Sequence, residues 1–282
     1  ATVNVGVLPS SVSPNPTVSP TTVCQGSTVS LSAGVSSGSF GVATIPFLYS
    51  AQPGTGVTTL ASNGTASVAL TSGSLDDGGW GSIPLGFTYN FFGTNFTSIH
   101  VGTNGLLQFG TYNSTQIAQY TGFASFPSTS NPSNIIAWMA NDLNVGTSPT
   151  GSSIKYWTDG IAPTRKFVIQ YTNISQYGTS ANTQNAQVIL YETTGLVEIH
   201  IQSALSGNTK YVGVQNAGTT GATAPGRNGF TTTITTPEAW QFIPPASYTV
   251  SWSPATYLSN STAVSPTFTG NIAGSYSYSA NV

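Results

Sequence analysis

The sequence predicts an all-β protein in which one β-sandwich domain is inserted into another. Three observations lead to this fold class. Apolar residues alternate with polar residues at period two, clusters of Gly, Pro, Asn and Ser separate the alternating segments at short spacing, and the charged side chains are confined to the middle of the chain. At 282 residues the chain is long enough for two domains of ordinary size.

Six segments carry the alternation most clearly, and we expect each to form a strand with one buried face. They are TVSLSA (28–33), SIHVGT (98–103), KFVIQYTNI (166–174), AQVILYE (186–192), LVEIHIQ (196–202) and YTVSWS (248–253). Short strands joined by frequent turns are typical of antiparallel sandwiches with hairpin and Greek-key connections.

The composition excludes two classes of partner. Charged residues make up 4% of the sequence, against about 25% in an average protein, and the formal net charge is −2 with five basic residues. Nucleic-acid binding and attraction to an anionic membrane both need clustered Lys and Arg. The sequence also has no run of 18 apolar residues, so we expect neither nucleic acid nor membrane insertion.

The charges also divide the chain. All twelve Asp, Glu, Lys and Arg residues lie between positions 76 and 238, and both flanks are free of them. This pattern indicates that the two flanks form one domain and that the middle is inserted into it.

The flanks resemble the two halves of a bacterial immunoglobulin-like or PKD-like repeat. The resemblance rests on PTTVCQGSTVSLSA (20–33) and on YTVSWSPATYLSNSTAVSPTFTGNIAGSYSY (248–278). In such repeats the two parts follow each other directly, whereas about two hundred residues separate them here. The resemblance therefore implies a discontinuous immunoglobulin-like domain at 21–40 and 246–282, interrupted by a larger, jelly-roll-like β-sandwich at 41–245.

The middle segment resembles a β-sandwich module of secreted Bacteroidetes proteins, many of them cargo of the type IX secretion system and gliding adhesins. The resemblance covers most of 75–243 and includes LDDGGWGSIPLGFTYNFFGTNFTSIHVGTNGLLQFG (75–110), NIIAWMANDLN (134–144) and EAWQFIPP (238–245). It implies an extracellular, cell-surface protein.

The immunoglobulin-like domain is one strand short. GSYSYSANV (274–282) corresponds to its penultimate strand, and no later residues supply the last one. Residues 1–7 resemble the last strand of a preceding unit, followed by a Pro-rich linker at 8–20. We therefore predict that residues 1–7 are lent to a neighbouring unit by β-strand addition; the alternatives are that they complete their own domain or form a frayed terminus. The predicted assembly strand is Ala1, Thr2, Val3, Asn4, Val5, Gly6 and Val7, and the predicted acceptor edge is Ser275, Tyr276, Ser277 and Tyr278.

Three acidic residues form the one candidate metal site. Asp76, Asp77 and Asp142 lie in oxygen-rich spots suited to a hard cation such as calcium. Asp in glycine-rich turns is more often a turn former, and this alternative remains open. In the resembling module a second Asp commonly stands beside Asp142, where this chain has Asn141, which weakens the metal assignment. We expect no other cofactor.

The remaining candidate residues are assigned structural roles. Alternation places His100 and His200 opposite the apolar faces of their strands, where we expect them to be solvated. Cys24 has no partner for a disulfide, and we expect a buried or half-buried thiol.

Aromatic residues offer a second kind of candidate site. Trp138, Trp157 and Trp240, with Tyr156 and Tyr171, would form a sugar-binding platform if exposed, but core packing is the preferred interpretation.

These observations predict a non-enzymatic, structural or adhesive extracellular protein, one repeat or subunit of a surface filament. Its partners would be copies of itself or adjacent repeats, and surface glycans or a host or substratum. The alternative is a carbohydrate-binding module on a secreted protein. A hydrolase is the least favoured class, because titratable residues are few and scattered.

Overall fold

The computed structural model is nearly all β and confirms the all-β sandwich class. It describes residues 2–8, 16–33, 38–245 and 249–281. The chain divides into two compact units: unit 1 comprises residues 1–37 and 246–282, and unit 2 comprises residues 38–245. The inserted segment thus begins three residues before the predicted position 41 and ends at the predicted position 245.

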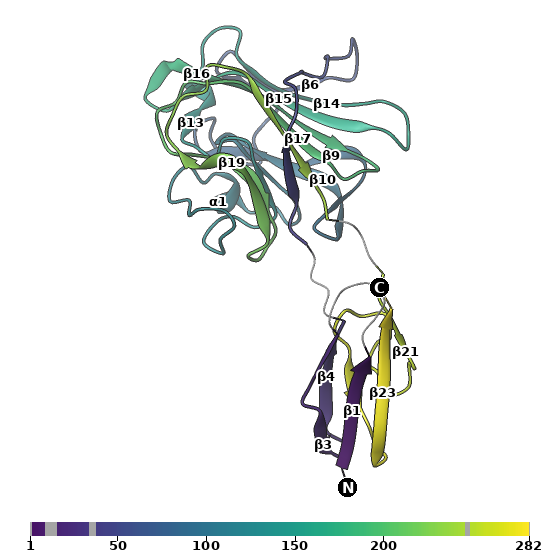
Figure 1. Ribbon diagram of the computed structural model, residues 1–282. Helices are drawn as coiled ribbons and strands as arrows, with labels where there is room; N and C mark the ends of the chain where they lie inside the picture. The colour runs from purple at the N-terminus through teal and green to yellow at the C-terminus, as the bar shows by residue number, and fades with distance from the viewer. Residues whose placement is uncertain (1, 9–15, 34–37, 246–248, 282) are drawn as a thin grey trace. The chain divides into compact units, whose positions relative to one another are not determined.

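Unit 1 consists of two small sheets (Figure 1). The four-stranded sheet has the order β21 (Ser251–Ser253), β23 (Gly274–Asn281), β1 (Thr2–Leu8) and β3 (Thr22–Cys24), and the three-stranded sheet has the order β2 (Thr17–Ser19), β4 (Thr28–Ser32) and β22 (Thr267–Thr269). Alternating side chains fill the core of this unit, because Val29 and Leu31 of β4 pack with Trp252, Phe268 and buried neighbours.

The strand β2 corrects the predicted linker at 8–20. Residues 17–19 pair antiparallel with β4, with Val18 opposite Leu31, and Val18 packs against the unit 1 core. The packing of Val18 and the pairing with β4 outweigh the weak strand signal of a segment flanked by Pro16 and Pro20. Residues 9–15 of the predicted linker lie outside the described residues.

The strand β1 lies between β23 and β3 of its own chain (Figure 1). It runs parallel to β23, with Val5 opposite Tyr276 and Val7 opposite Tyr278, and antiparallel to β3. The edge predicted to accept a strand is therefore covered by a strand, and in this single chain the strand is the chain's own β1. Ala1 of the predicted assembly strand is outside the described residues.

Unit 2 is a larger two-sheet sandwich. Its seven-stranded sheet has the order β19 (Gly221–Phe230), β18 (Lys210–Gln215), β12 (Ile135–Ala137), β11 (Leu106–Gln108), β10 (Thr94–Gly102), β9 (Gly78–Phe91) and β8 (Ser72–Gly73). The nine-stranded sheet has the order β5 (Gly41–Thr44), β20 (Glu238–Ile243), β17 (Val197–Ala204), β16 (Thr179–Tyr191), β15 (Lys166–Gln176), β14 (Ser153–Asp159), β6 (Thr58–Ser62) and β7 (Thr65–Ala66), and β13 (Leu143–Asn144) pairs with β15.

The central strands of unit 2 are buried on both faces. On β15, Phe167 and Ile169 point into the main core between the sheets, whereas Val168 packs on the outer face with Trp157 and Ile189. The outer face of the other sheet is covered in the same way by the segment that carries the short helix α1 (Ser114–Ile117). The 3-10 helix η1 (Val145–Thr147) follows β13.

This covering corrects the prediction for both histidines. Each lies opposite the apolar residues of its strand, as alternation predicted, but each is only 2% exposed. The His100 Nδ1 accepts a hydrogen bond from the Ser82 N–H, and the His200 Nδ1 accepts one from the Leu48 N–H. Leu48 belongs to a loop, and the His100 Nε2 lies 2.8 Å from the carbonyl oxygen of Gly110 in the loop after β11. Loops therefore contribute to covering faces that strand periodicity alone would leave in solvent.

Two further predictions concern single side chains. Cys24 is exposed, so the prediction of a buried or half-buried thiol is wrong; its side chain alternates with the inward-packing Val23 on β3. The preference for core packing of Trp138, Trp157 and Trp240 is confirmed, because each is at most 8% exposed.

Candidate functional site

Two loops of unit 2 bring the three predicted acidic residues together. Asp76 and Asp77 lie in the turn between β8 and β9, and Asp142 lies directly before β13. One carboxylate oxygen from each residue lies within 4.8 Å of the others. We call these three residues the acidic cluster.

Local hydrogen bonds shape the β8–β9 turn. The Ser74 Oγ accepts hydrogen bonds from the backbone N–H groups of Asp76 and Asp77, each at 3.2 Å. Gly73 has φ +72°, and an added Cβ would lie 2.0 Å from the Asp77 carbonyl oxygen. Only glycine fits this position, so the turn that carries two of the acids depends on it.

Asn104 joins the two loops. Its Nδ2 donates to an Asp77 carboxylate oxygen at 2.9 Å, and its Oδ1 accepts from the Leu143 N–H at 2.8 Å. The Asn104 side chain is fully buried and is held by both loops. Asp77 and the segment containing Asp142 are therefore fixed in position by the protein before any ligand arrives.

The electrostatics of the cluster are unfavourable for three ionised carboxyl groups. Burial, followed by the charges of Asp77 and Asp76, raises the pKa of Asp142 to about 6. Burial and the neighbouring Asp77 also raise the pKa of Asp76. The Asp76 Oδ1 is buried and has no hydrogen-bond partner. A bound cation would remove this repulsion and supply the missing partner.

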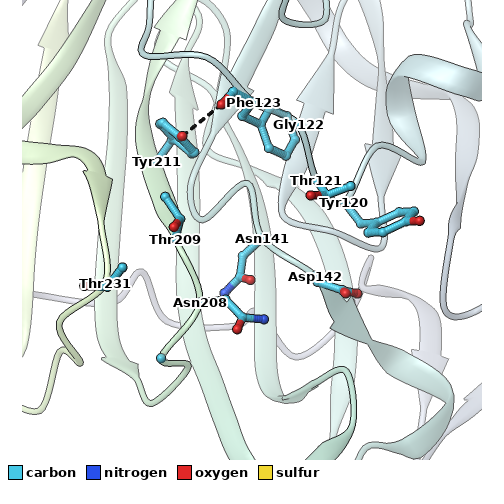
Figure 2. Close-up of a pocket in the computed structure, with 11 residues that line it drawn as sticks. Tyr120, Thr121, Gly122, Phe123, Asn141, Asp142, Asn208, Thr209, Tyr211 and Thr231 are labelled. Carbon is cyan, nitrogen blue, oxygen red and sulfur yellow. Dashed lines mark hydrogen bonds between the residues drawn. The ribbon is translucent and has the colours of Figure 1, made fainter.

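A pocket of about 620 Å³ adjoins the cluster (Figure 2). Its volume lies within the range of about 300–1,000 Å³ that is usual for small-molecule sites. Asn141 and Asp142 form one part of its wall, the segment 120–123 forms another, and Gly207, Asn208, Thr209, Tyr211 and Thr231 form the rest. Asp142 thus belongs to both the acidic cluster and the pocket.

Asn141 is the most unusual residue of the pocket. It is 1% exposed; its Nδ2 donates to the Ser206 hydroxyl at 2.7 Å, while its Oδ1 is buried without a partner. In Figure 2 the Asn141 side chain extends toward Asn208, with its oxygen on the side of Asp142. A buried amide oxygen without a donor is costly, by about 1–3 kcal/mol. The Asn141 Oδ1 thus lacks the partner that a buried amide oxygen normally has.

The donors of this site determine its chemistry. Carboxylate and amide oxygens suit hard cations such as calcium or magnesium, whereas zinc prefers nitrogen and sulfur ligands. Sequence reasoning found the three acids from their oxygen-rich turns. It missed the role of Asn104 and treated Asn141 only as a departure from a pattern, because their roles arise from contacts between distant segments.

The fold and site define a two-unit β-sandwich protein with a polar pocket in its larger unit. A family model described as NIDO related matches residues 48–254, which is more than half of the chain. The chain therefore belongs to the NIDO-related family, whose domains are typically extracellular. No curated protein and no solved structure matches the chain. Among the described residues, no helix has the length and apolar character required to cross a membrane.

Proposed function

We propose that this protein is a non-enzymatic structural and adhesive component of the cell surface, a unit of a filament or stalk assembled head to tail by β-strand complementation. The observation that carries the proposal is the place of β1 in the four-stranded sheet, between β23 and β3.

The backbone ladder around β1 supports an exchange of strands between units. Six residues of β1 are paired with β23 and three with β3. We call the place between β23 and β3 the β1 slot. Backbone groups of these two strands define it, so the same segment from any copy of the chain can pair there. A neighbour's strand of the same sequence offers the same backbone groups, so it can replace the chain's own β1 without altering the pairing.

The absence of charge in unit 1 supports the same proposal. Asp, Glu, Lys and Arg are absent from residues 1–75 and 239–282, which include both parts of unit 1. Monomeric β proteins commonly protect their sheet edges with charged side chains, Lys above all. A unit without such side chains is suited to contact with copies of itself.

A single substitution tests the lending of β1. Thr2 lies opposite Cys24, the chain's one cysteine, which is exposed. Paired strands hold opposite Cα atoms about 4.5–5.5 Å apart, a separation that a disulfide accepts. In the Thr2→Cys variant, oxidation should therefore form a disulfide between position 2 of β1 and Cys24 of the β3 with which it pairs, either in the same chain or in a neighbouring chain. We expect a covalent ladder on a non-reducing gel, at rising protein concentration, if neighbouring units exchange β1.

Two controls make the gel interpretable. The unchanged protein has one cysteine and can form no species larger than a dimer. Ile161→Cys places a second cysteine at a side chain that is 83% exposed in unit 2, and it measures cross-linking by random collision. An oxidised Thr2→Cys monomer at every concentration up to the millimolar range, with no ladder above the Ile161→Cys control, would refute the proposal.

A further inference from the structure

The carboxylates of this chain differ sharply in their partners. Four of the seven are paired with a basic side chain: Asp159 with Lys166, Glu192 with Arg165, Glu198 with His200, and Glu238 with Arg227. The other three are Asp76, Asp77 and Asp142, and no ion pair of the described residues includes any of them. These three are the residues whose oxygens lie within 4.8 Å of one another.

Two of the seven buried side-chain oxygens that lack a hydrogen-bond partner among the described residues lie at this place. The Asp76 Oδ1 in the cluster and the Oδ1 of Asn141, whose side chain is 1% exposed beside Asp142, both lack a hydrogen-bond partner. Buried polar atoms are nearly always satisfied, and exceptions commonly mark an ion or ligand. The three carboxylates within 4.8 Å of one another offer the oxygen ligands that calcium takes, six to eight in number, and the Asn141 oxygen lies on the side of Asp142 (Figure 2).

The pocket beside the cluster favours a neutral ligand with many hydroxyl groups. Apart from Asp142, its wall contains no ionisable acid or base other than tyrosine, and it offers the polar groups of Asn208, Thr209 and Thr231. Tyr120 stands in the same wall with 43% of its surface exposed. An exposed ring beside amide and hydroxyl groups matches a sugar, which has one apolar face and a polar edge.

We propose that Asp76, Asp77 and Asp142 bind a calcium ion, and that this ion and the adjoining pocket together bind a neutral glycan. Asp142 connects the two parts, because it lies in both. Calcium readily keeps open positions for ligand oxygens, so adjacent sugar hydroxyls would complete its coordination while Tyr120 stacks against the ring. This inference assigns unit 2 a specific ligand and does not depend on the exchange of β1.

The ion is tested first by thermal unfolding of the whole protein with calcium or with a chelator. Calcium at one hundred times its Kd should raise the Tm of unit 2 by roughly 5–10 °C. Asp142→Asn keeps the side-chain shape and should abolish this shift. Asp159→Asn is the matched control, because Asp159 pairs with Lys166 outside the cluster, and it should keep the full shift. An absent calcium shift in the unchanged protein would overturn the proposal.

The glycan is tested on an array of neutral glycans, with calcium and with chelator. Binding should require calcium, and Tyr120→Ala should weaken it at least tenfold while the calcium-dependent Tm shift stays unchanged. Tyr177→Ala removes a ring that is 53% exposed but does not line the pocket, and should leave binding unchanged. Glycan binding that survives the chelator, or a calcium shift with no glycan bound, would overturn the assignment of the ligand.

Discussion

Lys210 provides a quantitative test of the structure of unit 2. Its side chain is fully buried, and its Nζ donates to the carbonyl oxygens of Ser206 at 2.6 Å, Asn208 at 2.9 Å and Thr231 at 3.3 Å. The Nζ also lies 4.8 Å from the centre of the Phe230 ring. Burial, with a smaller effect of Arg227, lowers the pKa of Lys210 from 10.5 to about 8.

The lowered pKa makes stability rise with pH. Between pH 8 and 10.5 the folded protein loses the Lys210 proton while the unfolded chain keeps it. The unfolded state then binds more protons, so the free energy of unfolding increases with pH. The slope is about half of 1.36 kcal/mol per pH unit at pH 8 and approaches the full value above it, so we expect a gain of about 1.5 kcal/mol for unit 2 between pH 8 and 9.5. The buried Tyr89 and Tyr171 have raised pKa values, so they remain neutral in the folded state throughout this interval.

The assay compares the unchanged protein with Lys210→Met. Urea unfolding is followed by tryptophan fluorescence at pH 7, 8, 9 and 9.5, because four of the five tryptophans lie in unit 2. The substitution removes the proton-binding group, so the unchanged protein should gain about 1.5 kcal/mol of unfolding free energy relative to Lys210→Met from pH 8 to 9.5. Parallel curves for the two proteins would show that Lys210 has an ordinary pKa and would refute the argument.

Three further predictions address other parts of the molecule. Trp252→Ala should destabilise unit 1 by about 3–5 kcal/mol, because Trp252 is 4% exposed and its Nε1 donates to the Ala263 carbonyl; calorimetry should show that the transition of unit 2 is unchanged. Burial lowers the pKa of His100, so the unchanged protein should lose stability as the pH falls from 6.5, and His100→Gln should flatten this dependence in thermal scans at pH 5 and 7.5. Gly73→Ala should lower the Tm and abolish any calcium shift, whereas Gly54→Ala, where an added Cβ meets nothing within 4 Å, should leave both unchanged.

Local patterns predict the strands of this protein well because strand periodicity is a local property. Each of the six alternating segments overlaps a strand, and Ile199 and Ile201 point into the core as expected. The environment of His200 could not be predicted in this way. It depends on the Leu48 N–H, supplied by a loop 152 residues away in sequence, which covers the outer face of the sheet.

The candidate site shows the same division between local and distant effects. Asp76 and Asp142 could be singled out because oxygen-rich turns are visible in the sequence, but 66 positions separate them and no pattern predicts their contact. Asn104, which belongs to neither loop, bonds to both, and the Val145 N–H also donates directly to the Leu75 carbonyl. Asparagine is common in turns throughout this chain, so nothing in its sequence distinguishes Asn104 from the others.

Whether the chain's own β1 or a neighbour's β1 occupies the β1 slot depends on their relative concentrations, because both strands pair in the same way. A chain's own β1 is tethered to its slot through a short linker, and such tethers produce effective concentrations in the millimolar range. A neighbour's β1 offers the same backbone groups, so at micromolar concentration the chain's own strand wins the competition. Only tandem attachment or the crowding of a filament offsets this advantage.

A protein carrying two copies of the chain in series should therefore form the Thr2→Cys link across the two copies more readily than two separate chains do at the same concentration. Equal yields in the two cases would mean that tethering does not control the exchange.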